Sequence, residues 1–306
     1  MNMETARIRT LIARHRLRDM VFEVLGMIIM LMLLFILGAL FLRLAVDGWD
    51  RLGLDFFLDY PSRRAERAGI LPAWVGSLLV MFVTALAAVP VGVAAGVWLE
   101  EYAPRNAFTE VIEINVTNLA GVPSIVYGLL GLGLLVHGLH LGPSVAAAGL
   151  TLALMILPVV VVATRESIRA VPQTIREAAY GLGATRWQVT RDHVLPYSLA
   201  GILTGVIIGL SRAIGETAPL ITVGAVTFIA FLPPAPVQAG FPFLNFEWLS
   251  TPFTVMPIQM FNWVSRPDPA FQSTAAAAGV VLVSLTLLMN GLAIFLRYRA
   301  RKRIKW

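Results

Sequence analysis

The amino-acid sequence predicts an all-α membrane protein with six transmembrane helices. Of its 306 residues, 58% are hydrophobic and 14% are charged, and the mean hydropathy is +0.77. One soluble core cannot bury that much apolar surface. The apolar residues also occur in six runs, at 24–42 and at about 71–99, 115–139, 142–163, 199–232 and 273–296. Each run can cross the roughly 30 Å of hydrocarbon in a bilayer.

The first run, residues 24–42, contains no charged residue and is expected to form the first transmembrane helix. It is too long for a removable signal peptide, and no small-residue cleavage site follows it, so we expect an anchor that stays in the membrane. Residues 1–70 thus comprise an N-terminal cytoplasmic arm, this helix and an outer loop. Residues 71–298 form the main transmembrane domain with five spans, and residues 299–306 form a basic tail.

The positions of arginine and lysine predict that both termini are cytoplasmic, because basic residues concentrate in cytoplasmic segments. The basic residues at the two ends are Arg7, Arg9, Arg14, Arg16 and Arg18, and Arg297, Arg299, Arg301, Lys302, Arg303 and Lys305. The loop at about 164–198 is arginine-rich and lies on the same side. The first outer loop is an exception, with Arg51, Arg63, Arg64 and Arg67. We expect the basic ends to contact anionic lipid rather than nucleic acid.

The loop at about 164–198 contains a predicted helix-turn-helix with small side chains. Pro172 can open its first helix at the first helical position, where the missing N–H has no cost. Glu177, Ala178 and Ala179 are expected to form one face of this helix, which Gly181 and Gly183 end. A second helical run covers residues 187–194 and is expected to end at Pro196, because proline cannot continue a helix.

The run at 199–232 is too long for one straight helix, which would measure about 50 Å. Gly215 and Pro219 mark an expected break, next to Arg212 and Glu216, which are one helical turn apart. On a helical wheel the polar and glycine residues form one stripe, composed of Gly201, Thr204, Gly205, Gly209, Ser211, Arg212, Gly215 and Glu216. The glycines at 201, 205 and 209 are better explained by close helix packing than by ligand contact.

The charged pair in this run is expected to face protein or water, since arginine at the bilayer centre costs about 3 kcal/mol or more. It is either a structural ion pair between helices or an anion site. Glu216 leaves donors of the Arg212 guanidinium free for an oxyanion. A carboxylate repels a full dianion but accepts a hydrogen bond from an anion that still carries a proton. Hydrogenphosphate carries such a proton and sulfate does not.

Several kinds of chemistry are not expected of this chain. Its only lysines are Lys302 and Lys305, so it has no P-loop, and any ATP must be hydrolysed by another polypeptide. The chain has no cysteine, and no Ser/His/Asp arrangement can be assembled, so an enzyme is not expected. His137 and His140 without a neighbouring carboxylate make a poor metal site, so neither a metal nor another cofactor is expected.

The helix-turn-helix resembles the EAA loop of permease subunits of binding-protein-dependent ABC importers. That pattern is Glu-Ala-Ala, three residues, Gly, nine residues, an apolar residue, one further residue and Leu-Pro, and Glu177, Ala178, Ala179, Gly183, Leu195 and Pro196 match it. His193 departs from the pattern, which has an apolar residue at that position. The resemblance implies that the loop couples the membrane domain to an ATPase.

Five stretches resemble the PstA family of phosphate importer permeases and together span most of residues 70–298. They are EEYAPRN at 100–106, NLAGVPSIVYGLLGLG at 118–133, REAAYGLGATRWQ at 176–188, SRAIGETAPL at 211–220 and PIQMFNWVSRP at 257–267. The resemblance implies a type I ABC importer permease fold. It also places Arg212 and Glu216 in the translocation path, to which we assign Thr217, Asn118 and Ser124 of the matching stretches. If Arg212 is only structural, Asn118, Ser124 and Tyr127 are the next candidates.

The same resemblance implies three protein partners in a bacterial or archaeal cytoplasmic membrane. They are a second permease subunit (PstC-like), an ATPase dimer (PstB-like) and an extracytoplasmic phosphate-binding protein (PstS-like). Three alternatives remain at this point: a permease for sulfate, molybdate or phosphonate, a membrane scaffold for phosphate sensing, and a channel. A channel would need no ATPase-docking loop.

Overall fold

The computed structural model describes residues 2–238 and 243–303, and every regular element in them is helical. In chain order the elements are α1 (Asn2–Gly48), η1 (Trp49–Arg51), α2 (Leu54–Leu58), η2 (Ala65–Arg67), α3 (Leu71–Val97), η3 (Trp98–Tyr102), α4 (Ala107–Leu119), α5 (Ser124–Leu130), η4 (Gly131–Gly138), α6 (Val145–Arg169), α7 (Gln173–Gly181), α8 (Arg186–Val189), η5 (Thr190–Val194), α9 (Leu195–Gly215), α10 (Ala218–Val223), η6 (Glu247–Ser250), α11 (Met256–Val264) and α12 (Ala270–Arg303). The elements η3, η4 and η5 are π-helical turns.

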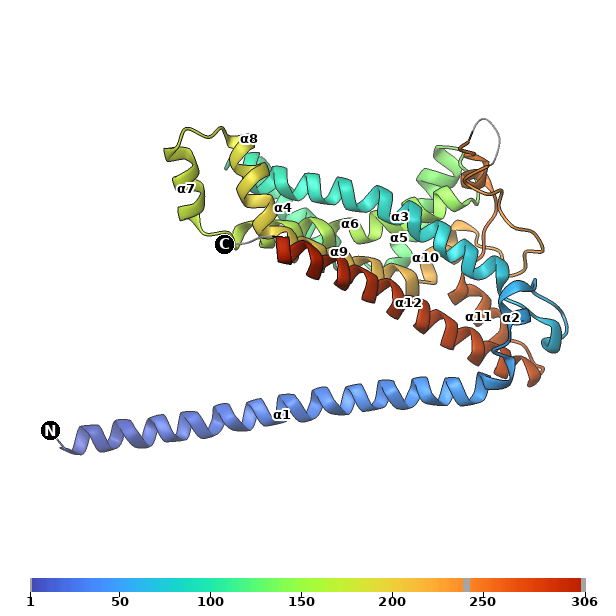
Figure 1. The fold of residues 1–306 in the computed structure, drawn as a ribbon, viewed down its shortest axis with the longest axis horizontal. Helices are drawn as coiled ribbons and strands as arrows, with labels where there is room; N and C mark the ends of the chain where they lie inside the picture. Colours follow the sequence, from blue (N-terminus) through green and yellow to red (C-terminus); the bar gives the residue numbers. More distant parts are fainter. Residues whose placement is uncertain (1, 239–242, 304–306) are drawn as a thin grey trace.

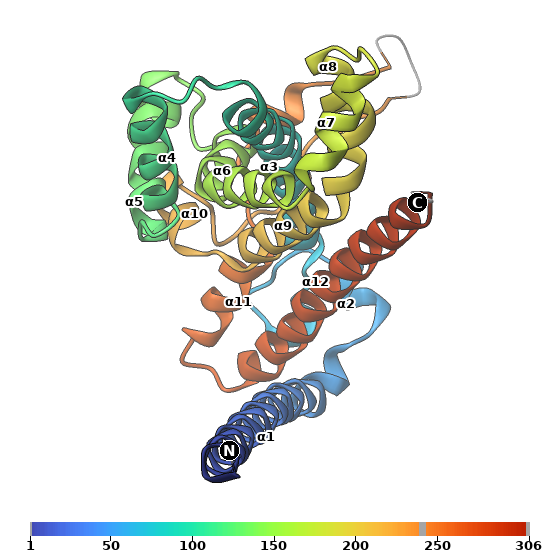
Figure 2. The same cartoon turned by 90° about the vertical axis from the view of Figure 1, so that its left-hand side faces the viewer.

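In the described residues, five helices are long and apolar enough to cross a membrane, and a bent helix pair gives a sixth candidate. Helix α3 packs mainly against α6, and α6 packs against α9, so these three form the centre of the molecule (Figure 2). Helix α1 lies beside α12 and diverges from the body toward the N-terminus (Figure 1). It begins at Asn2, which makes it much longer than the predicted run at 24–42.

Both chain ends and the α7–α8 hairpin lie at one end of the molecule, and α2, α11 and the long loop before α11 lie at the other (Figure 1). This arrangement agrees with the expectation that the two termini and the loop at about 164–198 share one side. Of the predicted tail, 299–306, only the part up to residue 303 is described, so Lys305 lies outside the described residues.

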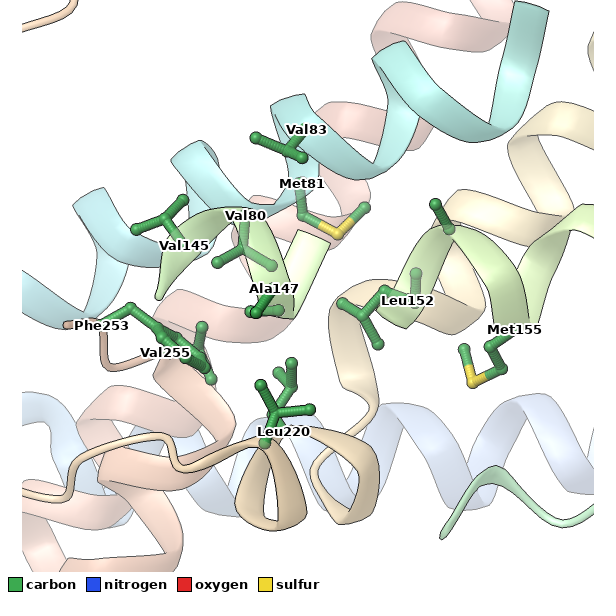
Figure 3. Close-up of a cluster of buried hydrophobic side chains, with 14 of the residues drawn as sticks. Val80, Met81, Val83, Val145, Ala147, Leu152, Met155, Leu220, Phe253 and Val255 are labelled. Atoms are coloured by element: carbon green, nitrogen blue, oxygen red, sulfur yellow. The ribbon is translucent and has the colours of Figure 1, made fainter. Parts of the chain in front are cut away.

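The main core joins α3, α5, α6, α10 and the segment before α11. Figure 3 shows Val80, Val145, Leu152, Leu220 and Phe253 from these elements pointing toward one another. Helices in lipid gain little from hydrophobic burial, so close van der Waals packing must hold them together. Small residues provide it between α3 and α6: a Cβ added at Gly92 or Gly96 would lie within 3 Å of Val160 or Thr164.

The predicted span at 115–139 is wrong as a single helix. The chain forms α4 and then α5 with η4, and the two parts meet at an angle of 110°. Pro123 explains the bend, because its ring disfavours helical geometry at the preceding residue and it has no N–H to donate to the previous turn. The span is therefore broken between Leu119 and Ser124.

The predicted break in the run at 199–232 is confirmed. Helix α9 ends at Gly215, Glu216 has an extended backbone (φ −77°, ψ 129°), and α10 begins at Ala218 with Pro219 in its first turn. The second half of the run is shorter than expected, because Gly224 ends α10 with a φ of +101°. Only glycine adopts that conformation at little cost.

At the α2–α11 end of the molecule, arginines make local contacts. Arg51 donates hydrogen bonds to the carbonyl oxygens of Glu66 (2.6 Å) and Ala68 (3.0 Å), and Arg266 lies 4.3 Å from the centre of the Phe271 ring. These contacts stabilise the segment between α1 and α3 and the turn between α11 and α12. Arg51, one of the four arginines of the predicted outer loop, thus has a local structural role.

Candidate functional site

The break between α9 and α10 brings Arg212 and Glu216 together. Arg212 lies in the last turn of α9, where the helix dipole favours a cation, and Glu216 is the first residue after the helix. The Arg212 Nε donates a hydrogen bond to the Glu216 Oε1 at 3.3 Å. Within the described residues the guanidinium makes no other hydrogen bond. The N–H groups of its two Nη atoms therefore remain available to bind a ligand.

The pair is accessible on the surface of the single chain. The Arg212 side chain is 41% exposed and that of Glu216 is 18% exposed. Most other members of the predicted polar stripe contact neighbouring helices, whereas a Cβ added at Gly215 would meet no other described element within 4 Å. The expectation of close packing holds for Gly201 and Gly205, where an added Cβ would collide with Ser167 and Ala163 of α6.

Two further members of the stripe contact α12. The Ser211 hydroxyl donates to the Asn290 side chain, and Arg297 donates to the Thr204 hydroxyl at 2.8 Å. Packing therefore accounts for these polar residues. Arg212 and Glu216 are the members of the stripe whose charge the neighbouring helices leave unexplained.

Helices α5 and α10 pack side by side next to the charged pair (Figure 2). Gly128 permits this contact, because an added Cβ would collide with Thr222 and lie 2.6 Å from the Pro219 Cα. The preceding Tyr127 is buried and donates its hydroxyl proton to the Leu119 carbonyl (2.7 Å). Tyr127 therefore holds α5 to the end of α4 across the bend between them.

The remaining predicted path residues lie around these two breaks. Thr217 follows Glu216 and is half-buried, Ser124 is the half-buried first residue of α5, and Asn118 is exposed near the end of α4. In the part of the chain that the structure describes, none of the three forms a hydrogen bond with Arg212. The structure thus pairs Arg212 with Glu216, with Thr217 next to Glu216 in the chain, and places Ser124 on the neighbouring α5.

The predicted helix-turn-helix is present as α7 and α8. Gly181 ends α7, and Gly183 has a φ of +81°, which a residue with a side chain adopts only with strain. Thr185 starts α8 with a capping box to Gln188. The expected place of Pro172 is corrected: it is the N-cap of α7, and the first helical residue is Gln173.

The expectation that Glu177, Ala178 and Ala179 share one face is wrong. Successive helical residues are about 100° apart, and Ala179 points inward, with 6% of its surface exposed, while Glu177 and Ala178 face solvent. Ala179 belongs to a small apolar cluster at the base of the hairpin. The other buried members of this cluster are Ile168, Val171, Val189 and Val194.

The expectation that Pro196 ends the second helix is also wrong. Helix α8, the π-helical turn η5 and α9 form one continuous helical stretch, and Leu195 and Pro196 are half-buried at the start of α9. Proline removes one backbone hydrogen bond and its ring crowds the preceding turn. A wider π turn directly before Pro196 gives that ring room.

Three large side chains on the hairpin surface were missed by the sequence reasoning. Leu182 is 90% exposed, Trp187 56% and Tyr180 43%. They lie around the turn between α7 and α8, where no other part of the described chain covers them. The available signal was the presence of large apolar residues in an otherwise polar loop.

Comparisons with known proteins agree with this arrangement. Residues 68–302 match the family described as binding-protein-dependent transport system inner membrane component. The probable ABC transporter permease protein YqgI of Bacillus subtilis is 33% identical over 229 residues, which are 74% of this chain and 73% of that protein. The phosphate transport system permease protein PstA of Xylella fastidiosa is 33% identical over 248 residues, with 79% of each chain covered. PstC of Mesorhizobium japonicum is 29% identical over 326 residues, covering 95% of this chain and 94% of that one.

Solved transporters share the fold at low sequence identity. A bacterial alginate ABC transporter chain is similar with a TM-score of 0.60 and 11% identity, covering 94% of this chain and 95% of that one. A chain of the inward-facing methionine transporter MetNI gives a TM-score of 0.56 and 17% identity, covering 75% and 94%. The predicted all-α importer permease fold is thereby confirmed. The chain belongs to the family of binding-protein-dependent transport system inner membrane components, the permease subunits of ABC importers.

Proposed function

We propose that this chain is one of two permease subunits of an ATP-driven inorganic phosphate importer. The observation that carries the proposal is the Arg212–Glu216 pair, which lies at a helix break in an apolar protein and keeps guanidinium donors free. Broken helices at membrane depth are tolerated where they line a cavity enclosed by protein. The relatives named as phosphate transport permeases support phosphate as the anion.

The exposure of Arg212 supports a second permease subunit. A guanidinium that is 41% exposed would face hydrocarbon in an isolated subunit, at a cost of about 3 kcal/mol or more. A second subunit of similar fold would cover it and enclose a shared cavity. The similarity to both PstA and PstC proteins agrees with a pair of related permeases, here this chain and a PstC-like partner.

In this cavity Arg212 would provide the positive charge and the planar donors, and Glu216 would orient the guanidinium. An arginine paired with one carboxylate is close to neutral as a pair, so it can receive an anion without holding it permanently. Glu216 would also accept a hydrogen bond from the protonated oxygen of hydrogenphosphate. Thr217 and Ser124 would add neutral hydrogen bonds from the two adjoining helix starts, and Asn118 from the end of α4.

The hairpin of α7 and α8 is the proposed docking surface for a PstB-like ATPase dimer, within a coupling loop at about 164–198. Glu177 and Ala178 would contact the ATPase together with the exposed Leu182, whereas Ala179 would hold the hairpin together from inside. Gly183 sets the turn of the hairpin. Leu195 and Pro196 would transmit movement into α9, whose other end carries Arg212.

The topology follows from the same assignment. Both termini and the hairpin would be cytoplasmic, and the end with α2 and α11 would receive phosphate from a PstS-like binding protein. The functional domain would be residues 71–298, preceded by the arm, first helix and outer loop (1–70) and followed by the basic tail (299–306). The membrane would be the cytoplasmic membrane of a bacterium or archaeon. ATP hydrolysis would belong to the ATPase partner.

Stimulation of ATP hydrolysis tests this proposal. The chain is purified with its partner permease and ATPase, and the phosphate-loaded or phosphate-free binding protein is added. Hydrolysis is expected to rise only with the phosphate-loaded form, because substrate delivery must reach the ATPase through this subunit. A complex stimulated instead by a sulfate-, molybdate- or phosphonate-loaded binding protein would support the other oxyanion assignment. A chain that copurifies with no ATPase would support the scaffold alternative.

A further inference from the structure

The end of α3 carries two adjacent carboxylates that reach different elements. The π turn η3 contains Glu100 and Glu101, and neighbouring helical residues point about 100° apart. Glu100 pairs with Arg169 of α6 at 2.9 Å and lies 3.6 Å from Arg165. Glu101 pairs with Arg176 of α7 at 2.8 Å. The second pair connects α3 directly to the hairpin.

The Glu101–Arg176 pair is the more protected of the two connections. The side chains are 7% and 12% exposed, and both Nε and Nη2 of Arg176 donate to the Glu101 Oε1. The same guanidinium also donates to two carbonyl oxygens. They belong to Ile168 in the last turn of α6 (3.0 Å) and to Val171 just after that helix (2.7 Å). One side chain therefore joins α3, the end of α6 and α7.

Helix α7 has few other connections to the membrane body. Its main backbone neighbours are α8 and η5, and Ala179 is its one buried residue. A polar pocket of about 630 Å³ lies between η3 and α7, lined among others by Glu101, Arg105 and Arg186. Apolar packing between α3 and this part of the chain comes from Val97, which packs against the cluster that contains Ala179. In contrast, α3 packs extensively on α6 and also contacts α9.

We infer that Glu101 is a positioning residue that transmits movement of α7 to α3 during the transport cycle. The inference rests on the proposed function, because it assigns a mechanical role within the coupling of ATPase to permease. When the ATPase displaces α7, the paired guanidinium pulls on the end of α3, and α3 moves with α6 and α9. Without the pair, α7 can move with the ATPase while α3 stays in place.

The test measures phosphate imported per ATP hydrolysed, using complete complexes in vesicles. In Glu101→Gln the isosteric amide removes the charge, and the complex should retain its ATPase and hydrolyse ATP. Phosphate per ATP should fall about tenfold, a size typical of coupling between two sites. Glu166→Gln is the matched control, because Glu166 pairs with Arg169 while its side chain is 63% exposed. Its ratio should equal the wild-type value.

A rescue separates a mechanical link from general stability. The chain has no cysteine, so Glu101→Cys with Arg176→Cys can be joined by a short thiol cross-linker. Cross-linking should restore phosphate per ATP toward the wild-type ratio, and this arm decides the matter if Glu101→Gln fails to assemble. An unchanged ratio in assembled Glu101→Gln, or a cross-linked complex as uncoupled as the open one, would overturn the inference. If wild-type vesicles import no phosphate, the proposed function fails instead.

Discussion

Arg212 lies in an apolar helix, and yet its charged side chain is exposed on the surface of the single chain. Its Nε binds Glu216, which fixes the orientation of the guanidinium while leaving the two Nη groups available. At the scale of residues, this geometry fits a transient anion site better than a structural ion pair. A structural pair between helices would join two different helices, whereas these two residues are neighbours on one segment.

Substitution of Arg212 separates charge from geometry. Arg212→Gln should lower phosphate uptake by tenfold to a hundredfold, because contacts to charged groups contribute about 1.5–3 kcal/mol. Arg212→Lys keeps the charge but loses the planar pair of donors. Its phosphate uptake should lie between that of the wild type and that of Arg212→Gln. Glu216→Gln should impair uptake less than Arg212→Gln. Uptake is measured in vesicles with equal amounts of assembled complex.

The pair of charges could be predicted from sequence because i,i+4 spacing places two side chains on one helix face. The contacts that the other stripe residues make could not be predicted from sequence. Whether Thr204 and Ser211 line a path or bind α12 depends on where α12 crosses α9, and that is set by long-range packing.

Equal uptake by Arg212→Gln and wild-type complexes would make Arg212 a structural residue and direct attention to Tyr127 and Ser124.

At the scale of elements, the α7–α8 hairpin has one buried and one exposed alanine. Ala179→Leu should overpack the cluster at its base and destabilise the hairpin by about 1–3 kcal/mol, seen as faster cleavage in limited proteolysis. Ala178→Leu should leave the hairpin protected but weaken copurification of the ATPase, because Ala178 faces outward. If Ala178→Leu retains ATPase and uptake at wild-type levels, the docking surface lies elsewhere.

The contact between α5 and α10 is expected to be equally sensitive to a single methyl group. Gly128→Ala introduces a Cβ within 3 Å of Thr222 and Pro219 and should lower the thermal stability of the complex in detergent. The matched control is Gly133→Ala in η4, where no atom of another element of the described chain lies within 4 Å of the added Cβ. A Gly128→Ala complex as stable as the Gly133→Ala complex would show that the two helices can separate freely.

The positions of these helices were predictable where a local signal decided the structure. Gly215 and Pro219 gave the break after α9, and the same reasoning applied to Pro123 would have found the bend between α4 and α5. Pro196 shows the limit of such signals. A π turn before a proline lets the helix continue, and neither local propensity nor hydropathy indicates that turn.

At the scale of the whole molecule, the fold places the hairpin and both chain ends together and the α2–α11 end opposite (Figure 1). A cysteine can be introduced at single positions because the chain has none. A membrane-impermeant thiol reagent applied to intact cells should label Asp268→Cys, which is exposed before α12, and spare Gln173→Cys at the start of α7. Both should react in opened membranes. Labelling of Gln173→Cys in intact cells would reverse the orientation and remove the hairpin from the ATPase.

The most direct test of the central claim is phosphate uptake by the complete complex in vesicles, with ATP on the side of the hairpin. A phosphate importer should accumulate phosphate only when ATP and the loaded binding protein are both present. Excess sulfate should leave that uptake unchanged. Uptake that proceeds without ATP, or accumulation of sulfate in place of phosphate, would contradict the assignment of this chain to an ATP-driven phosphate importer.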